Sequence, residues 1–84
     1  MKSKLIGQHI VVDPDICHGA PTFRGTRIMV ATVLDQAARG MSWEAIIDAW
    51  DFSITRDAIA EALYLANEVF KDHIGDYALE SARV

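Results

Sequence analysis

Two helix start signals in the second half of the chain constrain its fold more than any other feature. Ser42 is a typical N-cap residue with Glu44 in the first turn, and Thr55 with Asp57 repeats the arrangement. In each case the residue before the cap is apolar and can pack against an apolar residue one turn into the helix. The sequence therefore predicts a short helix from Ser42 to about Trp50 and a longer one that begins at Thr55.

A further helix is predicted ahead of these two. Apolar residues from Val30 onward recur at helical spacing, and Gly40 is placed as a C-cap glycine behind Arg39. The last helix has its own apolar stripe, which predicts an end near residues 71–72; the stripe consists of Ile59, Ala62, Leu63, Ala66 and Phe70. Residues 74–84 follow a predicted break at Gly75 and form either a short helix or a tail that orders on a partner.

The first 30 residues predict a small amount of β-structure. Residues 1–9 are expected to be a loosely held arm, and residues 10–12 form a short strand that ends in an Asp-Pro-Asp turn. Arg24 and Gly25 are the tip of a tight hairpin, with Gly25 at positive φ. The predicted fold is mainly α: a three-helix bundle of helix-turn-helix type, preceded by a short β-strand and a β-hairpin. The single domain spans residues 10–73, between the arm and the 74–84 tail.

Composition and charge narrow the classes of function. With 84 residues and 51% hydrophobic side chains, the chain has one core and is too apolar to be disordered. The net charge of −4 is uneven: residues 1–40 carry five Lys or Arg and three Asp, net +2, whereas residues 41–84 carry three against nine acids, net −6. A surface that binds phosphates is therefore expected in the first half.

Signals for catalysis, metals or membranes are weak. The single Cys17 cannot form an internal disulfide and belongs to no zinc-binding spacing, and its neighbour His18 is placed as an ordinary turn residue. Asp13 and Asp15 flank a proline in a common turn composition. We expect no enzyme activity, no cofactor and no metal. No apolar run is long enough to span a membrane, and a cytoplasmic location is expected.

The order of the helices matches that of three-helix DNA-binding domains, in which the last helix enters the major groove. That helix offers Arg56 alone among several carboxylates, which oppose contacts to DNA and favour a solvated packing face instead. Arg24 and Arg27, with Thr26 between them, are better placed to contact phosphates or a minor groove. The alternative is an internal role in which Arg27 pairs with Asp13 or Asp35.

Short motifs along the chain resemble the domain of unknown function 433 family over residues ~8–70. They include Asp13-Pro14, Gly19-x-Pro21, Gly25-Thr26-Arg27-Ile28 and Gly40-x-Ser42. The chain departs from the family pattern at Ala20, where Lys is frequent, and at Trp50-Asp51, where Tyr-Pro is frequent. The resemblance implies a homeodomain-like helical domain that serves as the antitoxin of a type II toxin–antitoxin pair.

Such an antitoxin would neutralise a PIN-like ribonuclease and, as a homodimer, bind its own operator DNA. In this reading the nucleic-acid contacts come from Arg24, Thr26, Arg27 and Arg56, and Arg83 in the tail contacts the toxin. The alternative is a protein–protein or oligomerisation module without a nucleic-acid role. In that case Trp43, Trp50 and Phe52 would form an exposed aromatic patch.

Overall fold

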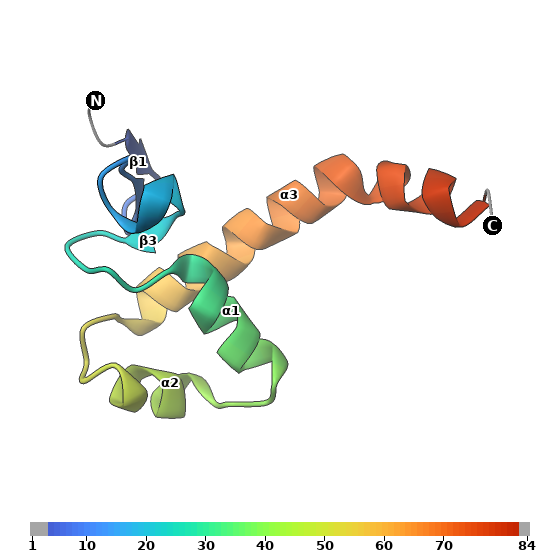
Figure 1. Ribbon diagram of the computed structural model, residues 1–84. Helices are drawn as coiled ribbons and strands as arrows, with labels where there is room; N and C mark the ends of the chain where they lie inside the picture. Colours follow the sequence, from blue (N-terminus) through green and yellow to red (C-terminus); the bar gives the residue numbers. More distant parts are fainter. Residues whose placement is uncertain (1–3, 83–84) are drawn as a thin grey trace.

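Three helices and a small antiparallel sheet make up residues 4–82, the part of the chain that the computed structural model describes, with side chains through residue 76 (Figure 1). In chain order the elements are β1 (Lys4–Ile6), β2 (Ile10–Val12), a 3₁₀ turn (Cys17–Gly19), β3 (Thr22–Phe23), α1 (Val30–Ala38), α2 (Trp43–Ala49) and α3 (Arg56–Ala82). The predicted mainly helical fold with β-structure in front of three helices is confirmed.

The first strand corrects the prediction of a loose arm over residues 1–9, of which residues 1–3 lie outside the described part of the chain. Residues 4–6 form β1, which pairs with β2 in the register Ile6↔Ile10 and is the outer strand of the order β1-β2-β3. Gly7 makes the tight connection possible with a φ of +79°. The side chain of Ile6 packs against the core, so the strand has an apolar reason to stay in place.

The hairpin around Gly25 forms as predicted in outline. Gly25 has a φ of +80°, and the Thr26 N–H donates to the Phe23 carbonyl at 3.0 Å. The Phe23 N–H donates to the Ile28 carbonyl at 3.0 Å, so the loop is wider than the predicted tight turn. Beyond it, Thr22 forms a bridge with Met29, and α1 begins at once.

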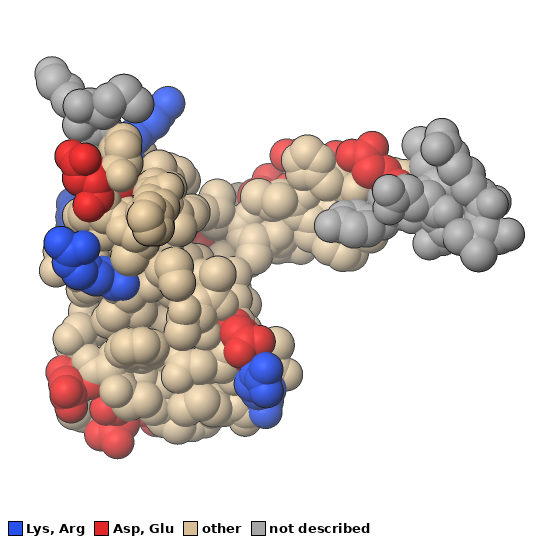
Figure 2. Space-filling model, in the orientation of Figure 1, with Lys and Arg blue, Asp and Glu red and all other residues tan. Residues whose placement is uncertain are grey.

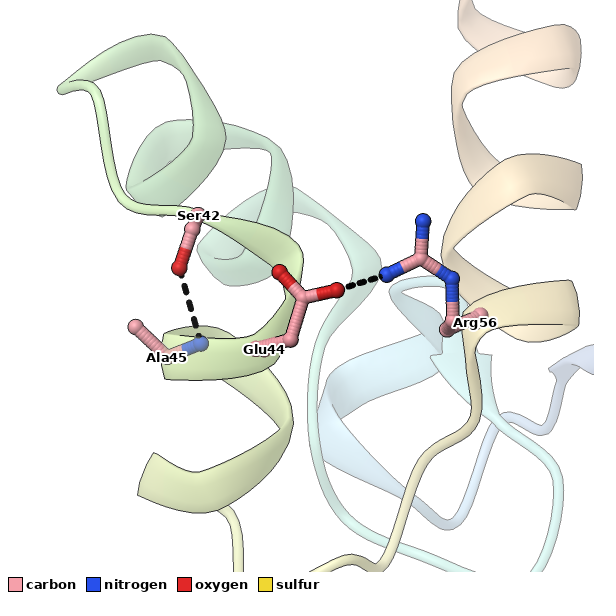
Figure 3. Close-up of polar contacts among 4 residues, drawn as sticks. All are labelled: Ser42, Glu44, Ala45 and Arg56. Carbon is pink, nitrogen blue, oxygen red and sulfur yellow. Dashed lines mark hydrogen bonds and ion pairs between the residues drawn. The ribbon is translucent and has the colours of Figure 1, made fainter.

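The predicted helix end near Gly40 and the predicted helix starts at Ser42 and Thr55 are confirmed. Gly40 has a φ of +94° just after α1. The Ser42 hydroxyl accepts the Ala45 N–H at 3.1 Å (Figure 3), and the Thr55 hydroxyl accepts the Ala58 N–H at the same distance. These caps fix where α2 and α3 begin and therefore which side chains face the core.

The core takes one fully buried large residue from each of five elements. Ile10 comes from β2, Phe23 from β3, Val33 from α1, Ile46 from α2 and Ile59 from α3. The sheet and the three helices therefore share one apolar centre, which the N-terminal part of α3 crosses. We call residues 4–66 the body.

The length of α3 departs from the prediction. The helix continues through Gly75 to Ala82 instead of ending near residues 71–72, so the predicted helix end and the predicted break at Gly75 are wrong. The domain boundary at residue 73 stays a prediction. A helical glycine costs only about 1 kcal/mol, which the flanking turns tolerate. Leu65 is the last α3 residue packed against the core, and the helix then leaves the body (Figure 1). We call residues 67–82 the stem.

The projecting stem makes the molecule elongated. The radius of gyration is 14.5 Å, whereas a compact chain of this length would have about 12 Å. Among the helices within residues 4–82, none combines the length and the apolar character that crossing a membrane requires.

Candidate functional site

The two arginines of the hairpin are exposed at its tip, and neither forms an ion pair with a carboxylate among the described side chains of residues 4–76. The alternative internal role for Arg27 is wrong, because Asp35 pairs with Arg39 at 2.8 Å. The other proposed partner, Asp13, instead accepts the N–H of Asp15 at 2.9 Å. Both guanidinium groups therefore remain available to an anion.

The hydroxyl of Thr26 is used inside the hairpin. It donates to the Phe23 carbonyl at 2.8 Å and accepts the Ile28 N–H at 3.0 Å. A phosphate contact by Thr26 would compete with both bonds, so its structural role is to hold the loop that carries the arginines. The Cys17 thiol contacts the Arg27 carbonyl at 3.5 Å and supports the same loop from a left-handed turn.

Arg56 stands in a different environment. Its guanidinium pairs with the Glu44 carboxylate (Figure 3). Its Cζ lies 4.9 Å from the centre of the Trp43 ring. A contact from Arg56 to DNA would have to break this pair. Asp57 and Glu61 follow on the same helix, so the beginning of α3 presents no free cation.

The predicted aromatic patch is reduced to one residue. Trp43 and Trp50 are half-buried against the core, and the Trp50 indole N–H donates to the Gln36 side chain at 2.8 Å. Phe52 is 73% exposed, in a left-handed conformation with a φ of +61°. A shared patch of three aromatic rings is therefore wrong, and Phe52 alone faces solvent. Arg83 lies outside the described residues.

Glu61 has a role that the sequence did not reveal. Its two carboxylate oxygens accept the N–H groups of Gln8 and His9 at 2.9 and 2.7 Å, which fastens the β1–β2 turn to α3. The Gln8 N–H lowers the pKa of Glu61, and the His9 N–H and the nearby Arg24 add to the effect, against burial, which raises it. This contact also places the sheet, and with it the hairpin, relative to the helices.

The stem carries an apolar face that nothing in the described part of the chain covers. Phe70 and Ile74 are 59% and 42% exposed, and Leu63 precedes them on the same side of α3. Val69, which is 52% exposed, is turned toward α1 instead. Phe70 and Leu63 were predicted to belong to the apolar stripe of the last helix. Helical periodicity shows that this face is apolar, but it does not show which residues pack on it.

An open apolar groove lies where α1 faces α3. Its volume is about 320 Å³, and it is lined by Pro21, Val30, Ala31, Leu34, Ala62, Leu65, Ala66 and Val69. Charges are distributed around these surfaces unevenly. Figure 2 shows acidic side chains along the stem, and both basic and acidic ones beside the β-part of the body. The molecule thus has a cationic hairpin at one side and an acidic, partly apolar helix at the other.

Comparison with known proteins places this arrangement in a family. The sequence profile described as "Protein of unknown function (DUF433)" matches residues 10–66, which is most of the chain and nearly all of the body. The resemblance inferred from the short motifs is thereby confirmed. Neither curated proteins nor solved structures gave a match.

Proposed function

The chain belongs to the DUF433 family, and we propose that it is an antitoxin-type module that uses its stem to bind and neutralise a PIN-like ribonuclease in the cytoplasm. The observation that carries this proposal is the uncovered apolar face of the stem, with Phe70 59% exposed. An amphipathic helix with such a face binds by lying in an apolar groove of its partner.

The charges of the stem specify the kind of groove. Glu68, Asp72 and Asp76 outnumber Lys71 between residues 67 and 76, and Lys71 pairs with Glu68 at 3.0 Å. The stem therefore suits an apolar groove with basic residues at its rim. A ribonuclease needs a basic surface to bind the RNA backbone, and a helix that occupies this surface would keep the substrate out.

The test is co-expression of the full chain with the product of the adjacent reading frame, followed by co-purification and a ribonuclease assay. We expect Phe70→Ser, alone or with Ile74→Ser, to weaken binding at least tenfold, since a buried aromatic anchor contributes most of such an interface. Tyr64→Ser is the matched control, because Tyr64 is an aromatic residue of α3 that is 68% exposed but lies on the body, ahead of the stem. Equal binding by the Phe70 and Tyr64 variants would exclude the stem, and a neighbour that is no nuclease would end the antitoxin proposal.

A second proposed function is operator binding by the hairpin. The supporting observation is that Arg24 and Arg27 are exposed and form no ion pair among the side chains that the structure describes, those of residues 4–76. Two such arginines can contact phosphates or a minor groove without insertion of the acidic α3.

This second function is testable by titrating operator DNA at increasing salt. In the variant Arg24→Ala/Arg27→Ala the slope of log K against log [salt] should fall by about two phosphate contacts. Arg39→Ala/Arg56→Ala makes the same change in net charge but removes arginines that are already ion-paired, and should leave the slope nearly unchanged. Equal slopes for the two variants would assign any binding to net charge alone.

A further inference from the structure

One row of side chains along α3 changes from small to large where the helix leaves the body. Every fourth residue from 62 to 74 belongs to this row, which we call the ladder: Ala62, Ala66, Phe70 and Ile74. Residues four apart are neighbours on the surface of a helix, so these side chains form one continuous ridge. Ala62 and Ala66 line the α1–α3 groove, whereas Phe70 and Ile74 are 59% and 42% exposed on the stem. The ladder therefore joins a hollow to a projecting apolar pair of the same spacing.

Two small and two large side chains at equal spacing are complementary to themselves in the antiparallel direction. If two copies of α3 cross antiparallel at the level of Glu68, Phe70 of one copy lies opposite Ala66 of the other. Ile74 then lies opposite Ala62 in the same register. Both pairs recur with the two copies exchanged, which is the condition for an isologous two-fold contact. Ridges of residues four apart pack in this way in the commonest class of helix crossing, at about −50°.

The α1–α3 groove has room for the large end of the ladder. A cavity of about 150 Å³ already holds benzene, and the groove has a volume of about 320 Å³. Every described side chain that lines it is apolar, so it suits an aromatic ring. Figure 1 shows that α1 and the stem diverge, and Val69 at the beginning of the stem is part of the lining. The groove is therefore continuous with the apolar face of the stem.

The charges of α3 do not oppose a contact between two ladders. At 3.6 residues per turn, the charged residues between positions 61 and 76 all fall on the half of the helix away from the middle of the ladder; they are Glu61, Glu68, Lys71, Asp72 and Asp76. His73 flanks the ladder, and its Nδ1 lies 3.6 Å from a carboxylate oxygen of Asp76 on its own helix. Two copies can therefore meet along the ladder without placing carboxylates face to face.

We propose that two copies of this chain form a two-fold dimer in which Phe70 of each copy packs on Ala66 of the other, at the open side of its α1–α3 groove. One contact then covers both the groove and the apolar face of the stem. It is additional to the proposed toxin binding and does not depend on it. Because both use Phe70, the toxin and the second copy compete for the stem.

The area available agrees with a dimer of modest affinity. A helix segment of about 15 residues is about 22 Å long and 10–12 Å wide, so half of its surface is on the order of 400 Å². Two such halves, together with the α1 side chains at each groove, bury roughly 1,000 Å², which is near the lower limit for a specific contact. We therefore expect association that depends on protein concentration.

Sedimentation equilibrium of the full chain alone, from about 10 µM to about 1 mM, measures the dimer. Phe70→Ser should raise the dissociation constant at least tenfold, as expected for a central aromatic anchor. Ala66→Phe should do the same, because it fills the space that Phe70 of the other copy needs. Ala31→Glu tests the groove without a change in α3, since it places a charge in the lining from the exposed side of α1.

Phe52→Ser is the matched control for these variants. Phe52 is an aromatic residue that is 73% exposed, but it lies on the loop between α2 and α3, away from the stem (Figure 1). Its substitution should leave the dissociation constant unchanged. Circular dichroism checks that each variant is folded.

Mixing the Phe70→Ser and Ala66→Phe chains gives the most specific readout. In the mixed pair, Phe70 of one chain meets the unchanged Ala66 of the other. In the second half of the contact, the added ring of the Ala66→Phe chain lies opposite the small side chain of the Phe70→Ser chain. The mixture should therefore associate at least tenfold more tightly than either variant alone. A parallel contact, or one in another register, predicts no such recovery.

Toxin binding separates this proposal from the proposed function. Ala66→Phe and Ala31→Glu keep Phe70, so they should weaken the dimer without weakening toxin binding, whereas Phe70→Ser should weaken both. A chain that stays monomeric at about 1 mM would overturn the dimer and leave the toxin proposal standing. The same holds if Phe70→Ser associates like the unmutated protein or if the mixture shows no recovery. A dimer that behaves as expected in a chain that binds no toxin would have the reverse meaning.

Discussion

Replacing Glu61 by Gln tests the contact that places the sheet on the helices. The carboxylate accepts two backbone N–H groups, from Gln8 and His9. Gln keeps one acceptor oxygen and sets an amide NH₂ against the second N–H. A hydrogen bond to a charged group contributes about 1.5–3 kcal/mol, less where water competes, as it does at the exposed Gln8 bond. We therefore expect Glu61→Gln to lower the free energy of unfolding by about 1–2 kcal/mol at pH 7.

The stabilisation of the fold by the Glu61 carboxylate should depend on pH. The folded-state pKa of Glu61 lies below its ordinary value of 4.5, so this carboxylate stabilises the fold fully above about pH 5. The contribution is lost as the pH falls through the folded-state pKa. The difference in stability between the unmutated chain and Glu61→Gln should consequently shrink as the pH is lowered from about 5 toward 3.

Urea unfolding at several pH values measures both quantities, and amide hydrogen exchange at Gln8 and His9 reports on the turn itself. Glu68→Gln is the matched control, since Glu68 lies on the same helix in an exposed pair with Lys71 and should cost less than about 0.5 kcal/mol. If Glu61→Gln unfolds at the same urea concentration as the control, or if the turn amides exchange at unchanged rates, Glu61 does not anchor the sheet.

Two further substitutions test the turns and caps around this contact. Gly7→Ala places a Cβ about 2.7 Å from the Glu61 carboxylate at a residue with positive φ, whereas the Cβ of Gly25→Ala lies in open space and meets only the cost of the positive φ. Both variants should have a lower free energy of unfolding in urea than the unmutated chain, and the loss should be about 1 kcal/mol larger for Gly7→Ala. Thr55→Ala removes the hydroxyl that caps α3 and should cost about 1 kcal/mol in the same measurement, while a Thr55→Ser chain that lost as much would contradict the capping role.

The parts of the fold that depend on neighbouring residues were predictable from sequence. Ser42, Thr55 and Gly40 act within one helical turn of their own position, and each was identified correctly. Gly25 likewise needs only its own loop. Contacts between distant segments were not predictable. The turn between β1 and β2 is held by Glu61, more than 50 positions away, and on sequence alone that carboxylate counted only as an acid that opposes DNA.

In the candidate sites, too, features set by neighbouring residues were predictable and contacts between distant segments were not. Sequence placed Arg24 and Arg27 at a hairpin tip, and the structure leaves both exposed. It could not show that Trp43 and Trp50 turn inward while Phe52 stays outside, because all three are large aromatic residues in one short segment. The stem escaped prediction for a related reason. Periodicity identifies the apolar face of a helix, but the size of the body determines how far along the helix other residues pack against that face.

The point at which α3 leaves the body coincides with the end of the family match. Leu65 is the last α3 residue packed on the core, and the DUF433 profile ends at residue 66. The caps, the core and the Glu61 anchor all lie at or before that point, so we expect the body to fold from its own contacts. Substitutions on the stem should then change partner binding with little effect on stability, because Phe70 and Ile74 contribute nothing to the core. Equal losses of stability and binding in Phe70→Ser would mean that the stem folds back on the body.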